Sequence, residues 1–469
     1  MSNLSVLLVD PFYNPKMVPP HWSLGIIENK LNKAGINTKI VDFIDETCEG
    51  KDIAYFQKQE NIFIQNVCDL AKNVDYVYIT SSFGIPLKQK PVFPRVIKLS
   101  EEIKKVNPAA KIIVGGSTVN YANRMLGINS FKEVDRGLVD KYIFGDETKF
   151  VEYIFNSHNI SADHLFDIEP IKWNSWEFNK YPNYLSLITA KGCIYNCSFC
   201  YETKIFDNKY ETLSIDTVLE NIRINIFEKN IKKFAIEDSS FLSNPDFEKF
   251  CDEIIKNKWQ IQWSAYGRID QILKYQKLLP KIREAGCTSL IIGIESPKDS
   301  TLKEVNKNCT SFDAMETVEL LRKNSIGVQG CFVLGFPGDT YEDIEKTIDY
   351  GLSLKLFAYR WHVYQPNLTD KIQTYIADVM PQPIDYLKIQ TNFPDSCIPE
   401  VLESSENQLM LLTEEHFLIR AIPYLDPESP ILNKYGYNNL AFNKIFNIIK
   451  TKLLNKSVTF NEEEMYNTI

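Results

Sequence analysis

The sequence is poor in positive charge and has no long hydrophobic stretch. Its 469 residues contain 52 Lys and Arg against 61 Asp and Glu, which gives a formal net charge of −9. This acidic balance disfavours broad nucleic-acid binding, which needs a basic surface. No apolar run approaches the ~20 residues of a membrane-spanning helix, and the N-terminal residues lack the pattern of a secretory signal peptide. We therefore expect a cytoplasmic protein that binds neither membranes nor nucleic acid.

The sequence also lacks the paired knuckles of a structural zinc site, which usually draws four ligands from two such pairs. Only one C-x2-C spacing occurs among the ten cysteines. What is present is a single tight group, Cys193, Cys197 and Cys200, at C-x3-C-x2-C directly after the apolar run 185–190. Three soft thiolates in one loop suit an iron–sulfur cluster. On spacing alone, zinc, a disulfide pair and buried free thiols remain as alternatives.

The chain length predicts two or three domains, and the first 156 residues alternate strand-like and helix-like patterns. Continuous apolar strands between helices are typical of a parallel sheet covered on both faces. We therefore expect an α/β protein whose residues 1–156 form a doubly wound, Rossmann-like domain. Ligands bind such sheets at the carboxyl ends of the strands, which here are small or polar: Asp10–Pro20, Ser81-Ser82 and Gly115–Thr118. The expected strands are 5–10, 38–43, 76–81, 111–115 and 142–144, with a helix over 22–34 that stops at Gly35.

Residues 157–184 are interpreted as a linker, after which the alternation resumes around the cysteine loop. Six strand–helix units over 185–366 fit a partial (β/α)6 barrel. Helices that cover the outside of the barrel require the outward-facing side chains of each strand to be apolar. Because side chains alternate along a strand, the remaining side chains face the lumen. That set is largely polar, whereas a merely structural barrel would fill its lumen with branched aliphatic residues. The expected strands are 185–190, 232–238, 260–268, 288–296, 327–336 and 356–365, and the expected helices are 215–229, 246–257, 275–285, 312–324 and 341–354.

Residues 367–469 carry helical patterns over 406–420 and 440–454, separated by prolines that break the segments. We expect a small, mainly helical C-terminal cap that closes the mouth of the barrel.

The cysteine loop resembles the signature of the radical S-adenosylmethionine (SAM) superfamily. The resemblance implies a [4Fe–4S] cluster on Cys193, Cys197 and Cys200, whose fourth iron is chelated by the amino and carboxylate groups of SAM. An electron from the cluster then breaks a carbon–sulfur bond of SAM and releases a 5′-deoxyadenosyl radical. A reductant protein of the flavodoxin or ferredoxin type is implied as a partner.

Further residues match superfamily motifs at the ends of the expected barrel strands. The resemblance implies that Glu237 and Asp238 meet the SAM amino group, and that Ser264 and Arg268 hold its carboxylate and ribose. From the residues alone, Arg268 could instead pair with Glu237 or Glu295, Glu295 could cap the next helix, and Phe199 could be plain core. The other implied SAM contacts are Glu295 in Gly293-Ile294-Glu295-Ser296 at the ribose, and Phe199 and Gly335 beside adenine.

The N-terminal half resembles the cobalamin-binding domain that precedes many radical SAM barrels. The match includes Pro19-Pro20, Val114-Gly115-Gly116 and Gly145-Asp146-Glu147. The D-x-H-x-x-G motif that supplies a lower histidine ligand is absent, and His21 is interpreted as a helix-start residue. The alternative is a domain that keeps the fold without the cofactor. The implied cobalamin contacts are Asp10, Pro11, Ser81, Ser82, Gly115, Gly116 and Ser117.

With cobalamin, the resemblance implies methylation of an unactivated carbon, or of phosphorus, in a natural-product or peptide substrate. Without it, cobalamin-free epimerisation, cyclisation or rearrangement becomes the favoured chemistry. His362 and Tyr364 fall on the lumen set of the last strand, where a substrate would lie. Cys331 falls on the inward set of the fifth strand and could donate a hydrogen atom, although a buried cysteine is more often a small hydrophobic residue. RNA modification is a third, disfavoured class.

Overall fold

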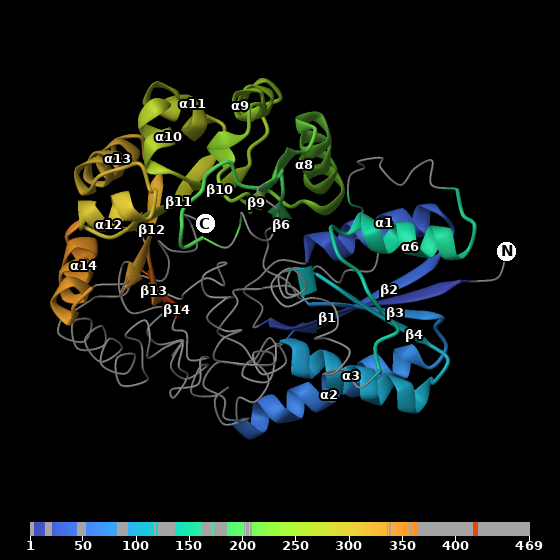
Figure 1. Ribbon diagram of the computed structural model, residues 1–469. Coiled ribbons are helices and arrows are strands. Elements are labelled where there is room, and N and C mark those ends of the chain that lie inside the picture. The colour runs from blue at the N-terminus through green and yellow to red at the C-terminus, as the bar shows by residue number, and fades with distance from the viewer. Residues whose placement is uncertain are drawn as a thin grey trace. The chain divides into compact units, whose positions relative to one another are not determined.

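The computed structural model describes most of the chain up to residue 363 (Figure 1). The described chain divides into two compact units, with a boundary between Asn183 and Tyr184. No helix among the described residues has both the length and the hydropathy needed to cross a membrane. The described residues are 4–14, 21–44, 53–81, 92–116, 119–120, 137–161, 171, 185–200, 202, 206, 209–334, 336, 339–356, 358–363 and 416–420.

The first unit is a five-stranded parallel sheet in the order β2-β1-β3-β4-β5. Helices α1 and α6 cover one face and α2 and α3 the other, as Figure 1 shows. All five residues of β3 are buried, as expected of a central strand covered on both sides. The elements are β1 (Ser5–Asn14), α1 (Trp22–Lys33), β2 (Asn37–Ile44), α2 (Ile53–Ala71), β3 (Tyr76–Thr80), α3 (Val92–Val106), β4 (Lys111–Gly115), β5 (Lys141–Tyr142) and α6 (Thr148–Ser157).

The predicted doubly wound domain is confirmed, with one correction at the end of β1. The sequence predicts a strand end at Asp10, but β1 continues to Asn14 after a register shift against β2 between Asp10 and Tyr13. Proline lacks an N–H and is tolerated in a sheet at a bulge, which is where Pro11 lies. The aromatic residues that follow favour a strand. The expected Asp10–Pro20 loop therefore starts later, and residues 15–20 lie outside the described part of the chain.

The second unit is a seven-stranded parallel sheet in the order β14-β13-β12-β11-β10-β9-β6. Helices α8 to α14 follow the outer side of this curved sheet (Figure 1). The elements are β6 (Leu185–Leu187), β7 (Ala190–Gly192), β8 (Tyr210–Thr212), α8 (Ile215–Lys229), β9 (Lys233–Ile236), η2 (Phe241–Ser243), α9 (Phe247–Lys256), β10 (Gln262–Gly267), α10 (Ile269–Lys274), η3 (Gln276–Leu278), α11 (Leu279–Glu284), β11 (Cys287–Glu295), α12 (Asp299–Glu304), α13 (Ser311–Lys323), β12 (Gly327–Leu334), α14 (Tyr341–Ser353), β13 (Ala358–Val363) and β14 (His416–Arg420).

All six predicted barrel strands are present, although the run expected over 185–190 is divided between β6 and β7. Buried and partly exposed residues alternate as expected in β9, β10 and the first part of β12, whereas β11 is buried along most of its length. In β10, Trp263 and Ala265 are buried whereas Ser264 and Tyr266 are partly exposed. Trp263 packs edge-on against Phe241 and Phe250 and donates its indole N–H to the Ala285 carbonyl at 2.9 Å. A buried indole needs such a partner, so this side of β10 belongs to the outer core and the other side is free for polar residues.

Two predictions for the second unit are corrected. The helix expected over 275–285 is a 3-10 turn followed by α11, which starts where Pro280 fits the first helical turn. The helix expected over 406–420 is wrong at its end, because His416–Arg420 form β14, which pairs with β13. A short apolar run such as Phe417-Leu418-Ile419 suits a strand as well as a helix. The rest of the predicted C-terminal cap lies outside the described residues.

Gly286, between α11 and β11, has no room for a side chain. Its φ is +98°, and an added Cβ would lie 2.2 Å from the Ile261 carbonyl oxygen. We expect Gly286→Ala to destabilise the second unit by about 3 kcal/mol or more, from left-handed strain together with overpacking. Gly35→Ala is the control, because Gly35 also has a positive φ of +76° but nothing within 4 Å of the added Cβ.

The loss of stability in each variant is measured against the wild-type protein by thermal unfolding, monitored by circular dichroism, and by limited proteolysis. Equal losses in the two variants would show that the contact with Ile261 contributes nothing.

Candidate functional site

The cysteine loop is carried by a two-stranded antiparallel ribbon formed by β7 and β8, in which Gly192 pairs with Tyr210. The predicted turn at Gly192 is confirmed. Its φ is +79°, and an added Cβ would lie 2.0 Å from the Lys209 carbonyl oxygen. Only glycine allows the chain to leave the ribbon so close to its returning strand.

The three thiols of the loop differ in exposure. Cys197 is buried, at 7% exposed, whereas Cys193 and Cys200 are partly exposed, and none of the three forms a disulfide. Burial raises the pKa of the Cys193 thiol and raises that of Cys200 to about 12. Among the described residues, no three His, Cys, Asp or Glu side chains lie close enough to share one metal ion. The cysteines of a four-iron cube bind different irons, so this finding concerns only single-ion sites.

A second loop, after α12, supports the cysteine loop. The Ser198 N–H donates to the Val305 carbonyl at 3.2 Å, and the Asn306 side-chain amide donates to the Asn196 carbonyl at 3.4 Å. The Cys197 thiol lies 3.8 Å from the Asn306 carbonyl oxygen. Asn306 and Asn308 both have left-handed φ values, which asparagine tolerates better than most residues. This loop was not predicted, because its only local signal in the sequence is the pair of asparagines.

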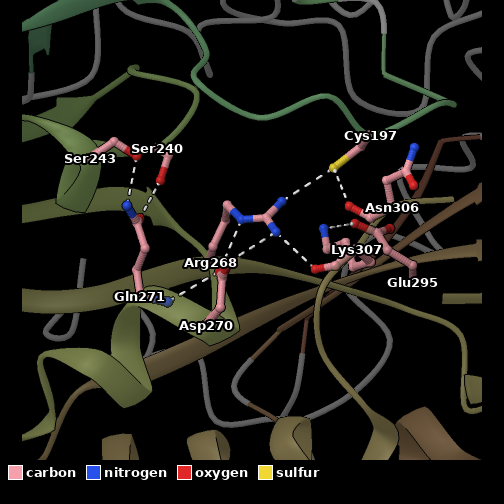
Figure 2. A network of polar contacts seen from close by, with 9 residues as sticks. All are labelled: Cys197, Ser240, Ser243, Arg268, Asp270, Gln271, Glu295, Asn306 and Lys307. Atoms are coloured by element: carbon pink, nitrogen blue, oxygen red, sulfur yellow. Dashed lines mark hydrogen bonds and ion pairs between the residues drawn. The ribbon is translucent and has the colours of Figure 1, made fainter. Parts of the chain in front are cut away.

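Arg268 lies at the centre of a polar network (Figure 2). Its Nη1 donates to Cys197 Sγ at 3.2 Å and its Nη2 to the Lys307 carbonyl at 2.8 Å. Its Nε and Nη2 both bond the Asp270 carboxylate, at 3.0 and 3.2 Å. The guanidinium also lies 3.6 Å from the centre of the Tyr195 ring. Burial opposes the charge of Arg268, but Asp270 and Cys197 outweigh it and raise the pKa of the guanidinium.

Glu295 and Lys307 form a buried ion pair beside this network. Lys307 Nζ lies 2.6 Å from Glu295 Oε1, and both side chains are at most 7% exposed. Burial lowers the pKa of Lys307, but Glu295 and Cys197 more than compensate, and the net shift is upward. A Cβ at Gly293 would lie 2.2 Å from the Glu295 carboxylate and 2.3 Å from Lys307 Nζ, so a side chain here would displace the ion pair.

Glu295 itself has a φ of +65°. A non-glycine residue held in this conformation stores strain, which is typical of functional sites. Lys307 was not predicted, because a lysine between two asparagines is typical of a solvent-exposed turn.

Asp238 has partners within the protein. Its carboxylate accepts from the Thr189 N–H at 2.7 Å and the Ala190 N–H at 3.1 Å, and it also contacts the Thr189 hydroxyl. Burial raises the pKa of Asp238 to about 6. Asp238 therefore holds the chain between β6 and β7, which leads into the cysteine loop.

The other predicted SAM contacts fall on the lumen side or beside the cysteine loop. Glu237 is exposed, with the Ser186 hydroxyl 3.4 Å from its carboxylate, and Ser264 is partly exposed in β10. Phe199 packs edge-on against Phe336, next to Val305 and Val333. It therefore contributes to a small hydrophobic cluster, as the alternative interpretation of this residue expected. Gly335 lies outside the described residues.

The predicted substrate residues are described only in part. Cys331 is partly exposed in β12, in register with Gly293 of β11. The backbone of His362 pairs in β13 with Val333 and Arg420. The His362 side chain and all of Tyr364 lie outside the described residues.

In the first unit, the described members of the predicted cobalamin set lie at the carboxyl edge of the sheet. The order β2-β1-β3 places a topological switch point between β1 and β3, where open α/β sheets bind ligands. Asp10 and Pro11 lie on the β1 side of this point, and both are buried. Ser82 and Ser117 lie outside the described residues.

Ser81, on the β3 side, uses its hydroxyl within the protein. It donates to the Gly115 carbonyl at 2.7 Å and accepts from the Val119 N–H at 3.3 Å. Gly116, with a φ of +106°, lies so close that an added Cβ would be 2.9 Å from the Ser81 nitrogen. These residues shape their part of the edge through backbone contacts and small side chains.

Comparison with known proteins agrees with this geometry. Residues 187–351 match the family model of the Radical SAM superfamily. The anaerobic magnesium-protoporphyrin IX monomethyl ester cyclase of Rubrivivax gelatinosus is 27% identical over 43% of this chain and 39% of its own length. The bacteriochlorophyllide d C-12(1)-methyltransferase of Chlorobaculum tepidum is 28% identical over 38% of this chain and 39% of its own length. The chain thus spans about two fifths of the length of these relatives.

Two solved structures share the fold. The radical SAM methyltransferase TsrM from Kitasatospora setae, with tryptophan substrate and a SAM analogue bound, has a TM-score of 0.63 at 13% identity and covers 96% of this chain and 99% of its own. The cobalamin-dependent SAM radical enzyme OxsB, with aqua-cobalamin bound, has a TM-score of 0.52 at 17% identity and covers 87% and 62%. At these identities the likeness shows the fold alone.

The buried carboxyl of Asp238 predicts a pH dependence. Its pKa is about 6 in the folded protein against 3.8 ordinarily, so the native state binds this proton more tightly than the unfolded chain does. The stability that this group contributes is complete below pH ~4 and is lost as the pH rises through ~6. Asp238→Asn keeps an oxygen acceptor for both backbone N–H groups and cannot ionise. We expect its melting temperature to exceed the wild-type value by roughly 5 °C at pH 7.5, with the difference vanishing near pH 4.

The control for this series is Asp216→Asn, because Asp216 is exposed and pairs with Lys249 on the surface. A constant difference between Asp238→Asn and wild type across pH 4 to 7.5 would contradict the raised pKa.

Proposed function

We propose that this chain, whose residues 187–351 belong to the radical SAM superfamily, cleaves SAM reductively and methylates a small molecule with the help of cobalamin. The observation that carries the proposal is the cysteine loop. Its C-x3-C-x2-C thiols lie within the matched domain, on a ribbon between β6 and β9 of a parallel barrel sheet.

The residues present fit a [4Fe–4S] cluster. Three soft thiols occur in one short loop, and Cys197 is buried, in contact with the cation Arg268 and with the cation Lys307 nearby. Positive charge in a dry environment stabilises an anionic group. Cys193, Cys197 and Cys200 would hold the cluster, which when bound supplies the electron that cleaves SAM.

The lumen side of the barrel is suited to hold SAM. Glu237 is exposed there, and Ser264 and Tyr266 are partly exposed on the same side of β10. A carboxylate can accept hydrogen bonds from an ammonium group, and hydroxyls can bond a carboxylate or ribose. Glu295 is held by Lys307, so any ribose contact it makes would come from a carboxylate fixed in place.

The carboxyl edge of the first unit would hold cobalamin. The support is the switch point between β1 and β3 together with an edge built from backbone at Ser81, Gly115 and Gly116. Such an edge suits a large flat ligand. The chain has no D-x-H-x-x-G motif, so we expect cobalamin to bind without a lower histidine ligand. When bound, cobalamin supplies a methyl carrier.

A methyltransferase reaction is favoured because several relatives bear that activity in their names, including enzymes that act on bacteriochlorophyllide d and on cytidylyl-2-hydroxyethylphosphonate. A carbon or phosphorus centre would be the acceptor. The tryptophan complex of TsrM supports a small-molecule substrate. An external reductant of the flavodoxin or ferredoxin type would supply the electron. Cyclisation is the second candidate, because a matched relative is a cyclase.

The cluster proposal is tested by anaerobic reconstitution with iron and sulfide. We expect about four irons per chain in the wild type, and formation of 5′-deoxyadenosine from SAM after reduction. Cys197→Ala should lose most of the iron and all SAM cleavage. Cys287→Ala is the control, since Cys287 is fully buried in β11, away from the cysteine loop, and should keep both. Full iron and full cleavage in Cys197→Ala would refute the ligand assignment.

The cobalamin proposal is tested by incubation with hydroxocobalamin, removal of free corrinoid, and a visible spectrum before and after denaturation. We expect close to one corrinoid per chain with the spectrum of a form that lacks a lower base. Repeated failure to retain corrinoid while SAM cleavage persists would favour the cobalamin-free alternative.

A further inference from the structure

We propose that Arg268 is a positioning residue for the iron–sulfur site. In this proposal it donates an N–H···S hydrogen bond to Cys197, which holds the cysteine loop before any metal arrives and raises the reduction potential of the bound cluster. The second part of this inference rests on the proposed cluster, whereas the first concerns the protein alone.

The contact itself is short and dry. Arg268 Nη1 lies 3.2 Å from Cys197 Sγ, and the two residues are 6% and 7% exposed. Few water molecules can compete for either group at this exposure. A hydrogen bond from a charged donor in a low-dielectric environment is stronger than one at the surface.

The guanidinium is fixed on its remaining sides, so the direction of this N–H is built in. The Asp270 carboxylate accepts hydrogen bonds from Nε–H and from one N–H of Nη2, and the Lys307 carbonyl accepts one from the other N–H of Nη2. The Tyr195 ring lies against its face at 3.6 Å. Four of the five N–H donors of arginine are therefore accounted for.

Arg268 also connects the cysteine loop to the barrel at two points. Tyr195 and Cys197 both belong to the loop, while Arg268 follows β10 directly and Asp270 lies in α10. The resemblance to radical SAM proteins implied a contact between Arg268 and the SAM carboxylate. The geometry instead favours a role toward the thiol, because most of its donors are already used within the protein.

A hydrogen bond to a cluster sulfur is one of the features that set its reduction potential. The donor stabilises the more electron-rich, reduced form, so it shifts the potential upward. Removal of the donor should therefore make the cluster harder to reduce.

The test uses Arg268→Gln, which removes the charge, and Arg268→Lys, which keeps the charge but cannot bond the three groups at once. Arg223→Gln is the matched control, because Arg223 is an exposed arginine that pairs with Glu220 on α8. Two quantities are measured: hydrogen exchange of the 193–200 peptide in metal-free protein, and the midpoint potential of the reconstituted cluster by redox titration followed by electron paramagnetic resonance.

We expect exchange of the 193–200 peptide to quicken by about tenfold or more in Arg268→Gln, the factor that corresponds to one lost hydrogen bond from a charged group. Arg268→Lys should lie between Arg268→Gln and the wild type. The midpoint potential should become more negative in the same order, with Arg223→Gln unchanged in both measurements.

Unchanged exchange and unchanged potential in both Arg268 variants would overturn the proposal. If Arg268→Gln fails to fold, Arg268→Lys decides it by the same two measurements. If the wild-type chain takes up no iron, the proposed function fails, and the exchange data still decide whether Arg268 holds the loop.

Discussion

The buried charge of Arg268 is the constraint on which the candidate site depends. A guanidinium removed from water loses several kcal/mol of solvation unless the protein replaces its hydrogen bonds. Here the replacements come from Asp270, from the Lys307 carbonyl and from Cys197. Each partner lies on a different segment: α10, the loop after α12, and the cysteine loop. The segments are therefore held together because separating any one of them leaves a buried polar group without its partner.

The same logic extends to the neighbouring ion pair. Lys307 holds Glu295, and the absence of a side chain at Gly293 makes the space for both. Loss of one member of a buried pair leaves an uncompensated charge, which is more destabilising than loss of the whole pair. A chain of contacts thus connects the end of β11 with Cys197 through Lys307 and Arg268 (Figure 2).

Much of the architecture follows from the sequence, because parallel strands buried on both faces appear as continuous apolar runs. The β3 run at Tyr76–Thr80 and the alternation in β10 are examples. Two glycine turns were also predicted correctly, since Gly35 and Gly192 both have positive φ values. The cysteine loop was identified by the spacing of its cysteines, which can be recognised in the sequence without knowledge of the fold.

The parts that could not be predicted depend on tertiary contacts. Glu237 and Asp238 are neighbouring carboxylates with the same motif assignment, yet Glu237 is exposed and Asp238 is 2% exposed and bonded to Thr189. Lys307 keeps its charge although it is buried, because Glu295 pairs with it across a distance that the local sequence does not reveal. β14 lies more than fifty residues after β13 in the chain, so local pattern gave no sign of their pairing.

The distance along the chain between the cysteine loop and its supporting loop has a consequence for biosynthesis. Cys197 and Asn306 are 109 residues apart in sequence, and chains emerge from the ribosome from the N-terminus onward. The thiols are thus made well before Val305 to Lys307, and before β11 and α12. A nascent chain that exposes Cys193, Cys197 and Cys200 still lacks the contacts that the loop after α12 makes with Asn196, Cys197 and Ser198. The site is completed only after this part of the barrel has folded, so iron delivered earlier would meet an incomplete site.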